Sequence, residues 1–261
     1  MNTNSEEIVT GTENLRKFHN WIKLQLILKS STKNSLLDIA CGRGGDLIKW
    51  SRARIKYVTA FDSDARALYE KNHFDGAIKR YSGMKSIPNM PKVFFWNISA
   101  IDPNVLHLIN SKDNGKMYDI VSCQFSMHYF VKEIDTVLNM ISKKLNKGGT
   151  FIGTATDGDL IKATGNVDND ILKVNIISEE MYTFELFSGN TDRETYFQIN
   201  GESTEYFLHK NVLINKCKEY GLEYVSILNF SEWMSKYSGS ALSKNEQIAS
   251  FLNFSFKFVK V

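Results

Sequence analysis

Short apolar runs alternate with segments of helical spacing between residues 35 and 156, and this alternation constrains the fold more than any other feature. The runs "SLLDIA", "KYVTAFD", "KVFFWN", "YDIVSCQF" and "GTFIGTAT" have the composition and length of strands. Between them, "DLIKWSRA", "SDARALYEKNHF", "DPNVLHLIN" and "KEIDTVLNMISKKLN" repeat apolar residues at helical spacing. Strands that alternate with helices form a mainly parallel sheet covered on both faces, so the sequence predicts a doubly wound α/β fold.

Both ends of the chain add to this core. A helix is predicted within residues 12–30, because apolar residues recur there at three- and four-residue steps after the possible cap Thr12. After residue 157, "KVNIISEEMYTFELF" and "ETYFQIN" predict strands of an added lobe, and "KNVLINKCKEYG" a helix ending at Gly221. "LEYVSILNF" and "FLNFSFKFVKV" predict two last strands. Too little chain separates these two for a parallel crossover, so an antiparallel terminal strand is expected.

Composition narrows the class of protein. A chain of 261 residues with 43% hydrophobic residues can bury one substantial core. No run approaches the roughly 18 apolar residues of a membrane helix, and the first residues do not form a secretion signal. We therefore expect a soluble protein of the cytoplasm that does not bind membranes. The cysteines Cys41, Cys123 and Cys217 lack the paired spacing of zinc or redox sites, so no metal is expected.

A glycine-rich turn, "CGRGGD", follows the first predicted strand. In open parallel sheets, ligands bind at the carboxyl ends of the strands. Gly42 and Gly44 allow close backbone approach, and Asp62, after the second strand, can accept hydrogen bonds from ribose hydroxyls. The turn lacks the third glycine of the dinucleotide fingerprint G-x-G-x-x-G, which disfavours pyrophosphate binding. With Asp38 on the preceding strand, it suits a small cationic cofactor with an amino-acid end.

Basic residues gather after this turn. The net charge is only +3, which does not by itself indicate a nucleic-acid partner. Residues 43–56, however, set several basic side chains against the single acid Asp46: Arg43, Lys49, Arg52, Arg54 and Lys56. This cluster is either a patch that attracts phosphate or an ordinary solvated helix face.

Four segments together resemble the mRNA cap guanine-N7 methyltransferase family. They are "FHNWIK", "LLDIACGRGGDLIKW", "DIVSCQFSMHYF" and "GGTFIGT", in this order and at suitable spacing. The resemblance runs from about Arg16 to the final strand and is dense through residue 156. It implies the Rossmann-like fold of class I S-adenosylmethionine-dependent methyltransferases, with seven strands in the sheet and an inserted substrate lobe.

The same resemblance implies one methyltransferase domain over residues 1–261. Its parts are an N-terminal helix at 12–30 that contributes to the cofactor site, a cofactor-binding core at 35–156, a cap-binding lobe at 157–210, and a C-terminal helix and strands at 211–261. The motifs also resemble the methyltransferase domains of capping enzymes of large cytoplasmic DNA viruses. In such enzymes triphosphatase and guanylyltransferase domains precede this domain in a longer polypeptide.

For the cofactor S-adenosylmethionine, the resemblance implies that Lys23 meets the methionyl carboxylate, Gly42 passes beneath the ligand, and Asp62 holds the ribose. At the third strand end the family has an acid near the adenine, whereas this chain has Asn97, whose side-chain carbonyl can accept from an amino group. The remaining predicted cofactor contacts are Asp38, Gln124 and Phe125. Phe125 has an alternative role as a core residue.

For the cap guanine, the resemblance implies His128, Tyr129 and Glu205. A carboxylate can accept from the ring N–H and amino group of guanine, and a histidine N–H can donate to its carbonyl. Phe251 falls where the family has a tyrosine, which keeps the ring and loses the hydroxyl. Guanine N7 carries a lone pair and no proton, so His128 is not expected to act as a base, and no residue is predicted to do more than position the reactants.

The substrate implied is capped RNA, GpppN-RNA, with Arg43, Lys49, Arg52 and Arg54 along its phosphates. Two other functions stay open at the level of sequence. One is an S-adenosylmethionine-dependent methyltransferase with a different acceptor. The other is a catalytically silent subunit that binds RNA or stimulates a capping partner.

Overall fold

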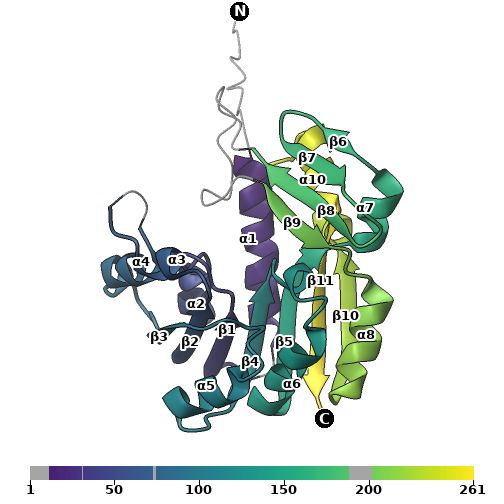
Figure 1. Ribbon diagram of the computed structural model, residues 1–261. Coiled ribbons are helices and arrows are strands. Elements are labelled where there is room, and N and C mark those ends of the chain that lie inside the picture. Colours follow the sequence, from purple (N-terminus) through teal and green to yellow (C-terminus); the bar gives the residue numbers. More distant parts are fainter. Residues whose placement is uncertain (1–11, 31, 73–74, 188–201) are drawn as a thin grey trace, which may run out of the picture.

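The computed structural model describes residues 12–30, 32–72, 75–187 and 202–261 (Figure 1). A seven-stranded sheet has the order β10-β11-β5-β4-β1-β2-β3. Its strands are β1 (Ser35–Ile39), β2 (Tyr57–Asp62), β3 (Lys92–Asn97), β4 (Tyr118–Gln124), β5 (Leu145–Thr156), β10 (Leu222–Asn229) and β11 (Asn253–Lys260). β11 runs antiparallel to both β5 and β10, and the other pairings are parallel. The predicted sheet and its antiparallel terminal strand are confirmed.

Helices cover both faces of the sheet, because successive side chains of a strand point to opposite sides. Leu36 packs into the apolar cluster on one face, and Leu37 into the cluster on the other. The first face carries α1 (Glu13–Leu28), α2 (Leu47–Arg52), α4 (Ala77–Met84), α9 (Phe230–Trp233) and α10 (Lys244–Phe251). The second face carries α5 (Val105–Asp113), α6 (Ile134–Lys144) and α8 (Lys210–Glu219).

Several helices differ in detail from the prediction. Thr12 precedes α1 as expected, but its side chain makes no capping hydrogen bond. The helix after β2 is only the short α3 (Ala65–Tyr69), where the Asp64 carboxylate accepts from the Arg66 N–H. The sequence did not predict α4, α9 or α10. The last of these has a capping box formed by Ser243 and Glu246.

A second sheet forms the lobe between β5 and α8. It follows α7 (Gly158–Thr164) and has the antiparallel order β6-β7-β8-β9. Its strands are β6 (Val167–Asp168), β7 (Leu172–Ile176), β8 (Met181–Leu186) and β9 (Ser203–Tyr206). The strands predicted within "KVNIISEEMYTFELF" are β7 and β8, whereas "ETYFQIN" lies outside the described residues. β9 was not predicted, and its pairing sets Tyr182 opposite Glu205.

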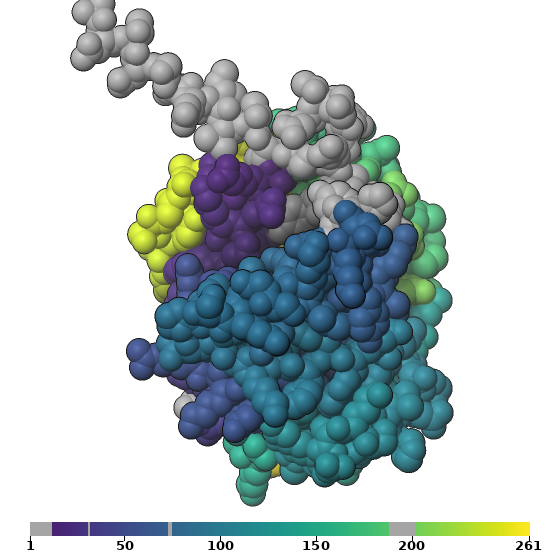
Figure 2. Space-filling view, turned by 90° about the vertical axis from the view of Figure 1, so that its left-hand side faces the viewer, coloured from purple at the N-terminus to yellow at the C-terminus, as the bar shows by residue number. Residues whose placement is uncertain are grey.

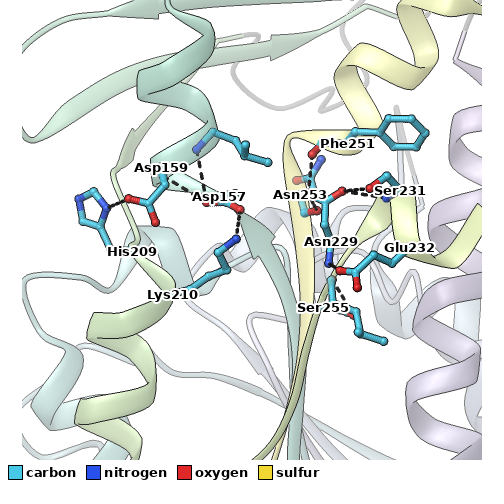
Figure 3. A network of polar contacts seen from close by, with 12 residues as sticks. Asp157, Asp159, His209, Lys210, Asn229, Ser231, Glu232, Phe251, Asn253 and Ser255 are labelled. Carbon is cyan, nitrogen blue, oxygen red and sulfur yellow. Dashed lines mark hydrogen bonds and ion pairs between the residues drawn. The ribbon is translucent and has the colours of Figure 1, made fainter.

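The two ends of the lobe are fastened together at its base, in an arrangement we call the clasp. Two side-chain contacts form it, between Lys210 and Asp157 at 2.8 Å and between His209 and Asp159 at 2.7 Å (Figure 3). The Gly158 N–H also donates to the Leu208 carbonyl at 3.0 Å. A Cβ atom at Gly158 would lie 2.9 Å from the Leu208 backbone, so only glycine fits there. The clasp fixes the lobe directly beyond the carboxyl end of β5.

The first described helix is attached to the C-terminal part of the chain. The Leu15 N–H donates to Glu246 Oε1, and His19 Nε2 lies 2.9 Å from Ser250 Oγ. Figure 2 shows α1, in purple, beside the yellow C-terminal segment and above the blue first half of the core. This attachment holds the N-terminal half of α1 near the edge of the sheet where the parallel strands end. Just after the helix, Ser30 Oγ accepts from Thr150 of β5, near the opposite edge. No helix of the described residues is both long and apolar enough to cross a membrane.

Candidate active site

The strand order reverses at the carboxyl ends of β1 and β4, and we call the region there the crevice. These strands are neighbours, yet β2 and β3 lie on one side of them while β5 lies on the other. In doubly wound sheets this point of reversal is where ligands bind. The glycine turn after β1, the residues after β4 and helix α1 all meet here.

The glycine turn is fastened to the end of β2. Gly42 has a φ of +53°, and its N–H donates to Asp62 Oδ2 at 2.7 Å. Asp62 Oδ1 accepts from the Asp64 N–H at 2.8 Å. A Cβ atom built on Gly42 would meet no atom within 4 Å, so open space adjoins the turn. Burial raises the pKa of Asp62, and the backbone donors oppose that shift.

Asn97 closes the neighbouring strand end. Its Nδ2 donates to the carbonyl oxygens of Asp62 and Ser63, both at 2.9 Å. Both bonds use the amide nitrogen, so the side-chain carbonyl oxygen is the atom that a ligand can use as an acceptor. The departure from an acid at this position is therefore compatible with contact to an amino group.

Lys23 belongs to a buried charge cluster beneath the crevice. Lys23 Nζ and Lys49 Nζ lie 2.7 and 2.8 Å from the same oxygen of Asp46. Burial acts to raise the pKa of Asp46, but the two ammonium groups outweigh it and hold that pKa well below its usual range. Burial raises the pKa of Asp38 well above its ordinary value, and the Asp46 charge adds to the shift. Two cations thus share one firmly ionised carboxylate.

Gln124 and Phe125 end β4 in different ways. Gln124 is buried, donates to Ser122 Oγ and accepts from Thr154 Oγ1, so it braces β4 against β5. Phe125 has a φ of +55°, a left-handed conformation that costs roughly 1–2 kcal/mol for a residue with a side chain. Its N–H donates to the Thr154 carbonyl at 2.8 Å. The ring stacks on His19 at 5.3 Å and lies 5.9 Å from Lys23 Nζ.

Beyond Phe125 lies a cavity whose empty space, including its mouth, is about 390 Å³. The lining residues come from six separate parts of the described chain: His19, Phe125, His128, Tyr129, Thr156, Phe184, Leu186, Glu205 and Asn253. Phe125 therefore forms a wall between the crevice and the cavity.

His128 points a hydrogen-bond donor into this cavity. It lies in η1 (Met127–Tyr129), and its side chain is 2% exposed. Its Nδ1 accepts from the Thr156 N–H at 3.4 Å, so the neutral ring carries its proton on Nε2. Within the described chain Nε2 has no hydrogen-bond partner, although Glu205 Oε2 lies 3.6 Å away. Burial lowers the pKa of His128 despite the opposing effect of Glu205, which favours the neutral ring.

Glu205 is a buried carboxylate surrounded by hydroxyl groups. Its Oε2 accepts from Tyr182 at 2.6 Å and from Thr156 at 3.1 Å, and these two hydroxyls also contact each other. Its Oε1 accepts from Ser203 at 2.9 Å and from Tyr129 at 3.4 Å. Burial raises the pKa values of Tyr129 and Tyr182, so both phenols keep their protons as donors.

Comparison with known proteins gives a family for this chain. Residues 6–252 match the family described as "mRNA (guanine-N(7))-methyltransferase domain". The chain belongs to this family.

Among relatives, a "Probable mRNA-capping enzyme" of Acanthamoeba polyphaga mimivirus is 35% identical over 167 residues, covering 56% of this chain and 14% of the relative. The "mRNA cap guanine-N(7) methyltransferase 1" of Arabidopsis thaliana is 30% identical over 239 residues, covering 85% of this chain and 62% of the relative. The chain thus spans less than two thirds of either relative.

Solved structures agree on the fold. An S-adenosylmethionine-dependent methyltransferase from Clostridium acetobutylicum matches with a TM-score of 0.61 at 14% identity, covering 94% of this chain and 92% of that one. A protein from Pyrococcus horikoshii matches with a TM-score of 0.59 at 14% identity, covering 95% and 92%. The predicted class I methyltransferase fold is confirmed, and the predicted guanine-N7 methyltransferase family is the one found.

The predicted basic patch of this family member is divided between two edges of the sheet. Arg43 lies in the glycine turn, where its carbonyl accepts from Arg80 at 2.7 Å. Lys49 is also at this edge, but its ammonium is taken up by Asp46 and the Gly45 carbonyl. Because α2 returns antiparallel to β1, its C-terminus lies at the opposite edge, and the N–H of Lys56 there bonds to the carbonyl of Asn34, just before β1.

Arg52 and Arg54, predicted to lie along the substrate phosphates, are far from the glycine turn in the structure. Both are exposed, but they lie at the amino ends of the parallel strands. A strand of five residues separates the two edges by roughly 16 Å. Closeness in sequence to the glycine turn did not translate into closeness in space.

The structure also places Phe251, a predicted cap contact, apart from His128, Tyr129 and Glu205. It is the last residue of α10, and it is absent from the described cavity lining, where Asn253 is found instead. Figure 3 shows the Phe251 ring directed away from the side chain of Asn253, while the Phe251 carbonyl accepts from Asn229 at 2.8 Å. At this part of the cavity wall the lining residue is the polar Asn253.

Several site residues were missed by sequence reasoning. His19 lies one helical turn before Lys23, and this i, i+4 spacing is a signal that both side chains share a face. Asp46 stands within the glycine-rich motif, but its role as partner of Lys23 needed the structure. Thr156 and Tyr182 meet only through the lobe, and no local pattern identifies them. Among the described residues, no group of three His, Cys, Asp or Glu side chains is arranged to hold a metal.

Proposed function

We propose that this chain transfers a methyl group from S-adenosylmethionine to guanine N7 of the 5′ cap of mRNA. One observation carries the proposal beyond family membership. A buried carboxylate and a buried N–H donor face the same cavity, with Glu205 Oε2 and His128 Nε2 only 3.6 Å apart. Guanine presents neighbouring groups of the opposite kind, two N–H donors and one carbonyl acceptor.

In the cavity, Glu205 accepts from the ring N–H and amino group of guanine, and His128 donates to the guanine carbonyl. The cavity is also lined by the rings of Tyr129 and Phe184. Aromatic faces pack against purines and tolerate the positive charge that N7 methylation creates. The neutral state of His128 favours this role, because a second positive charge beside the methylated base would be repulsive.

In the crevice, the residues fit the amino-acid and nucleoside parts of S-adenosylmethionine. Open space adjoins Gly42, and Asp62 holds its carboxylate at the edge of that space for the ribose hydroxyls. Asn97 offers its carbonyl oxygen to the adenine amino group. Lys23, 13% exposed in its side chain, is the cation for the methionyl carboxylate. When bound, the cofactor supplies a methyl group activated by its sulfonium centre.

No residue needs to act as a base. Guanine N7 has a lone pair and no proton, so the residues of this chain align the reactants and exclude water. Proximity and orientation lower such a barrier by roughly 7–11 kcal/mol. Phe125 is central to this task, because its strained backbone places one ring between the crevice and the cavity. Arg43, in the turn, is the proposed contact for the cap phosphates, and its guanidinium also donates to the Asp75 carbonyl at 3.5 Å. The cytoplasm remains the predicted place of action.

The proposal is tested with purified protein, labelled S-adenosylmethionine and unmethylated GpppA-capped RNA. After nuclease digestion, the label should be recovered in 7-methylguanosine. RNA with an ApppA end serves as the control and should stay unlabelled. Label on a ribose, or on another acceptor, would show that the acceptor is wrong. Cofactor binding by calorimetry without any transfer would instead identify a silent subunit.

A further inference from the structure

Tyr182 stands behind Glu205 and does not line the cavity. We propose that Tyr182 is a positioning residue for guanine selectivity, whose hydroxyl orients the Glu205 carboxylate so that each of its oxygens keeps an acceptor position for guanine. This inference rests on the proposed function and names the residue that makes its base recognition selective.

The hydroxyl hydrogens around Glu205 Oε2 can be counted. Tyr182 has one hydrogen and two acceptors in reach, Glu205 Oε2 at 2.6 Å and the oxygen of Thr156. An ionised carboxylate is the stronger acceptor, so the Tyr182 hydrogen goes to Glu205. Thr156 also has one hydrogen and two acceptors, Glu205 Oε2 at 3.1 Å and the closer Tyr182 oxygen, and the relay forms when Thr156 donates to Tyr182. This relay occupies one of the two lone-pair positions on Oε2 and leaves the other for an N–H of guanine.

The donors on Oε1 are more easily released. Ser203 has one hydrogen and two acceptors at the same distance of 2.9 Å, Glu205 Oε1 and the Phe184 carbonyl. Tyr129 lies at the longer distance of 3.4 Å. When guanine arrives, Ser203 can donate to the Phe184 carbonyl without losing a hydrogen bond. Tyr182 has no comparable second acceptor, because Thr156 must itself donate within the relay.

The lobe fixes Tyr182 in this role. Residues 182 and 205 are direct cross-strand partners of β8 and β9, and the Tyr182 side chain is fully buried. Its ring packs against Phe207 at 4.9 Å. Burial keeps its phenol protonated by raising the pKa. Tyr182 therefore acts through Glu205 and has no contact of its own with a base in the cavity.

The test compares two dinucleotide caps, GpppA and IpppA, by calorimetry. Inosine lacks the amino group of guanine, so the affinity ratio reports the second hydrogen bond to Glu205. We expect the wild-type protein to bind GpppA at least about tenfold more tightly than IpppA, the effect of one charge-assisted bond. In Tyr182→Phe the ratio should fall below about threefold, while affinity for S-adenosylhomocysteine stays unchanged. Tyr206→Phe, a half-buried tyrosine next to Glu205, is the matched control and should keep the wild-type ratio.

A second variant keeps the test decisive if Tyr182→Phe does not fold. Thr156→Val removes the other hydroxyl of the relay and should reduce the ratio, whereas Thr156→Ser should restore it. An undiminished ratio in a folded Tyr182→Phe protein, or in Thr156→Val, would overturn the inference and leave the proposed function intact. Failure of the wild-type protein to prefer GpppA would instead count against guanine recognition itself.

Discussion

The crevice and the cavity are assembled in different ways. The crevice depends on residues close together in sequence or directly bonded to the glycine turn, such as Gly42, Asp46 and Asp62. The cavity collects single side chains from distant parts of the chain, with His128 after β4 and Glu205 on the lobe. Local turn geometry builds the first, whereas tertiary packing builds the second. The two halves should therefore respond separately to substitution, and Phe125 is where they meet.

The largest expected effect is that of replacing Glu205, which should impair the cavity and leave the crevice intact. In Glu205→Gln, an amide replaces one acceptor oxygen with a donor that opposes the guanine N–H groups. We expect kcat/KM for capped RNA to fall by about a hundredfold or more, consistent with the loss of a buried charged acceptor. Affinity for S-adenosylhomocysteine should stay within about twofold by calorimetry. The exposed neighbour Glu202→Gln is the control. Parallel loss of cofactor affinity would mean that the halves are not independent.

The converse experiment uses Asp62. In Asp62→Asn the Gly42 N–H loses a charged acceptor, and a ribose would lose another. Hydrogen bonds to charged groups contribute about 1.5–3 kcal/mol, so S-adenosylhomocysteine affinity should fall between about tenfold and a hundredfold. GpppA affinity, measured without cofactor, should not change. A matching decrease in GpppA affinity would contradict the separation.

His19 belongs to the wall shared by both halves and predicts a pH dependence of stability. Burial, with Lys23 adding, lowers the pKa of His19 to about 3. The unfolded chain binds a proton near its ordinary value of about 6.5, so it gains protons first as the pH falls. Stability present above pH 6.5 should therefore be lost on acidification toward pH 3, by at most about 1.4 kcal/mol per pH unit from this residue.

Urea unfolding between pH 7 and pH 5 measures this dependence. His19→Gln should flatten the pH profile of the unfolding free energy. The exposed His107→Gln is the matched control and should leave the profile as it is in the wild-type protein. An equally steep profile in His19→Gln would show that other groups carry the acid sensitivity.

The smallest effect concerns the two edges of the sheet. Arg43→Glu should weaken capped-RNA binding several-fold and reduce the slope of log K against log salt by about one, the signature of one phosphate contact. Arg52→Glu combined with Arg54→Glu should change neither quantity, since both side chains lie at the far edge. Fluorescence titration over a series of salt concentrations distinguishes these outcomes. A change in the salt slope of the double variant would indicate that Arg52 or Arg54 contacts the RNA.

Strand periodicity predicts part of the crevice directly, whereas the cavity residues His128, Tyr129 and Glu205 were predicted only through the family resemblance. Periodicity located the strands, and the position of Asp62 at a strand end follows directly from that. The strand register within the lobe cannot be predicted from local sequence. The four residues of β9 acquire a defined position only by pairing with β8. The pairing of Tyr182 with Glu205 was therefore out of reach.

Two predicted contacts lie away from the other site residues for equally specific reasons. Arg52 was assigned to the basic patch because it is close to the turn in sequence. Helix α2 runs antiparallel to β1 and therefore places Arg52 at the opposite edge of the sheet. Phe251 was judged by residue type, but α10 ends there and β11 begins at Asn253. A change from helix to strand within two residues redirects the side chains, and Asn253 occupies the wall.

The clasp has a consequence for how such a protein can diversify. The chain leaves the core at Asp157 and returns at Lys210, and these two residues form an ion pair. The chain leaves and rejoins the core at two residues that are in contact. The length of the lobe can therefore change without altering the connectivity of the seven-stranded sheet. Insertions and deletions in the lobe can therefore change the residues that line the cavity while the core sheet stays the same.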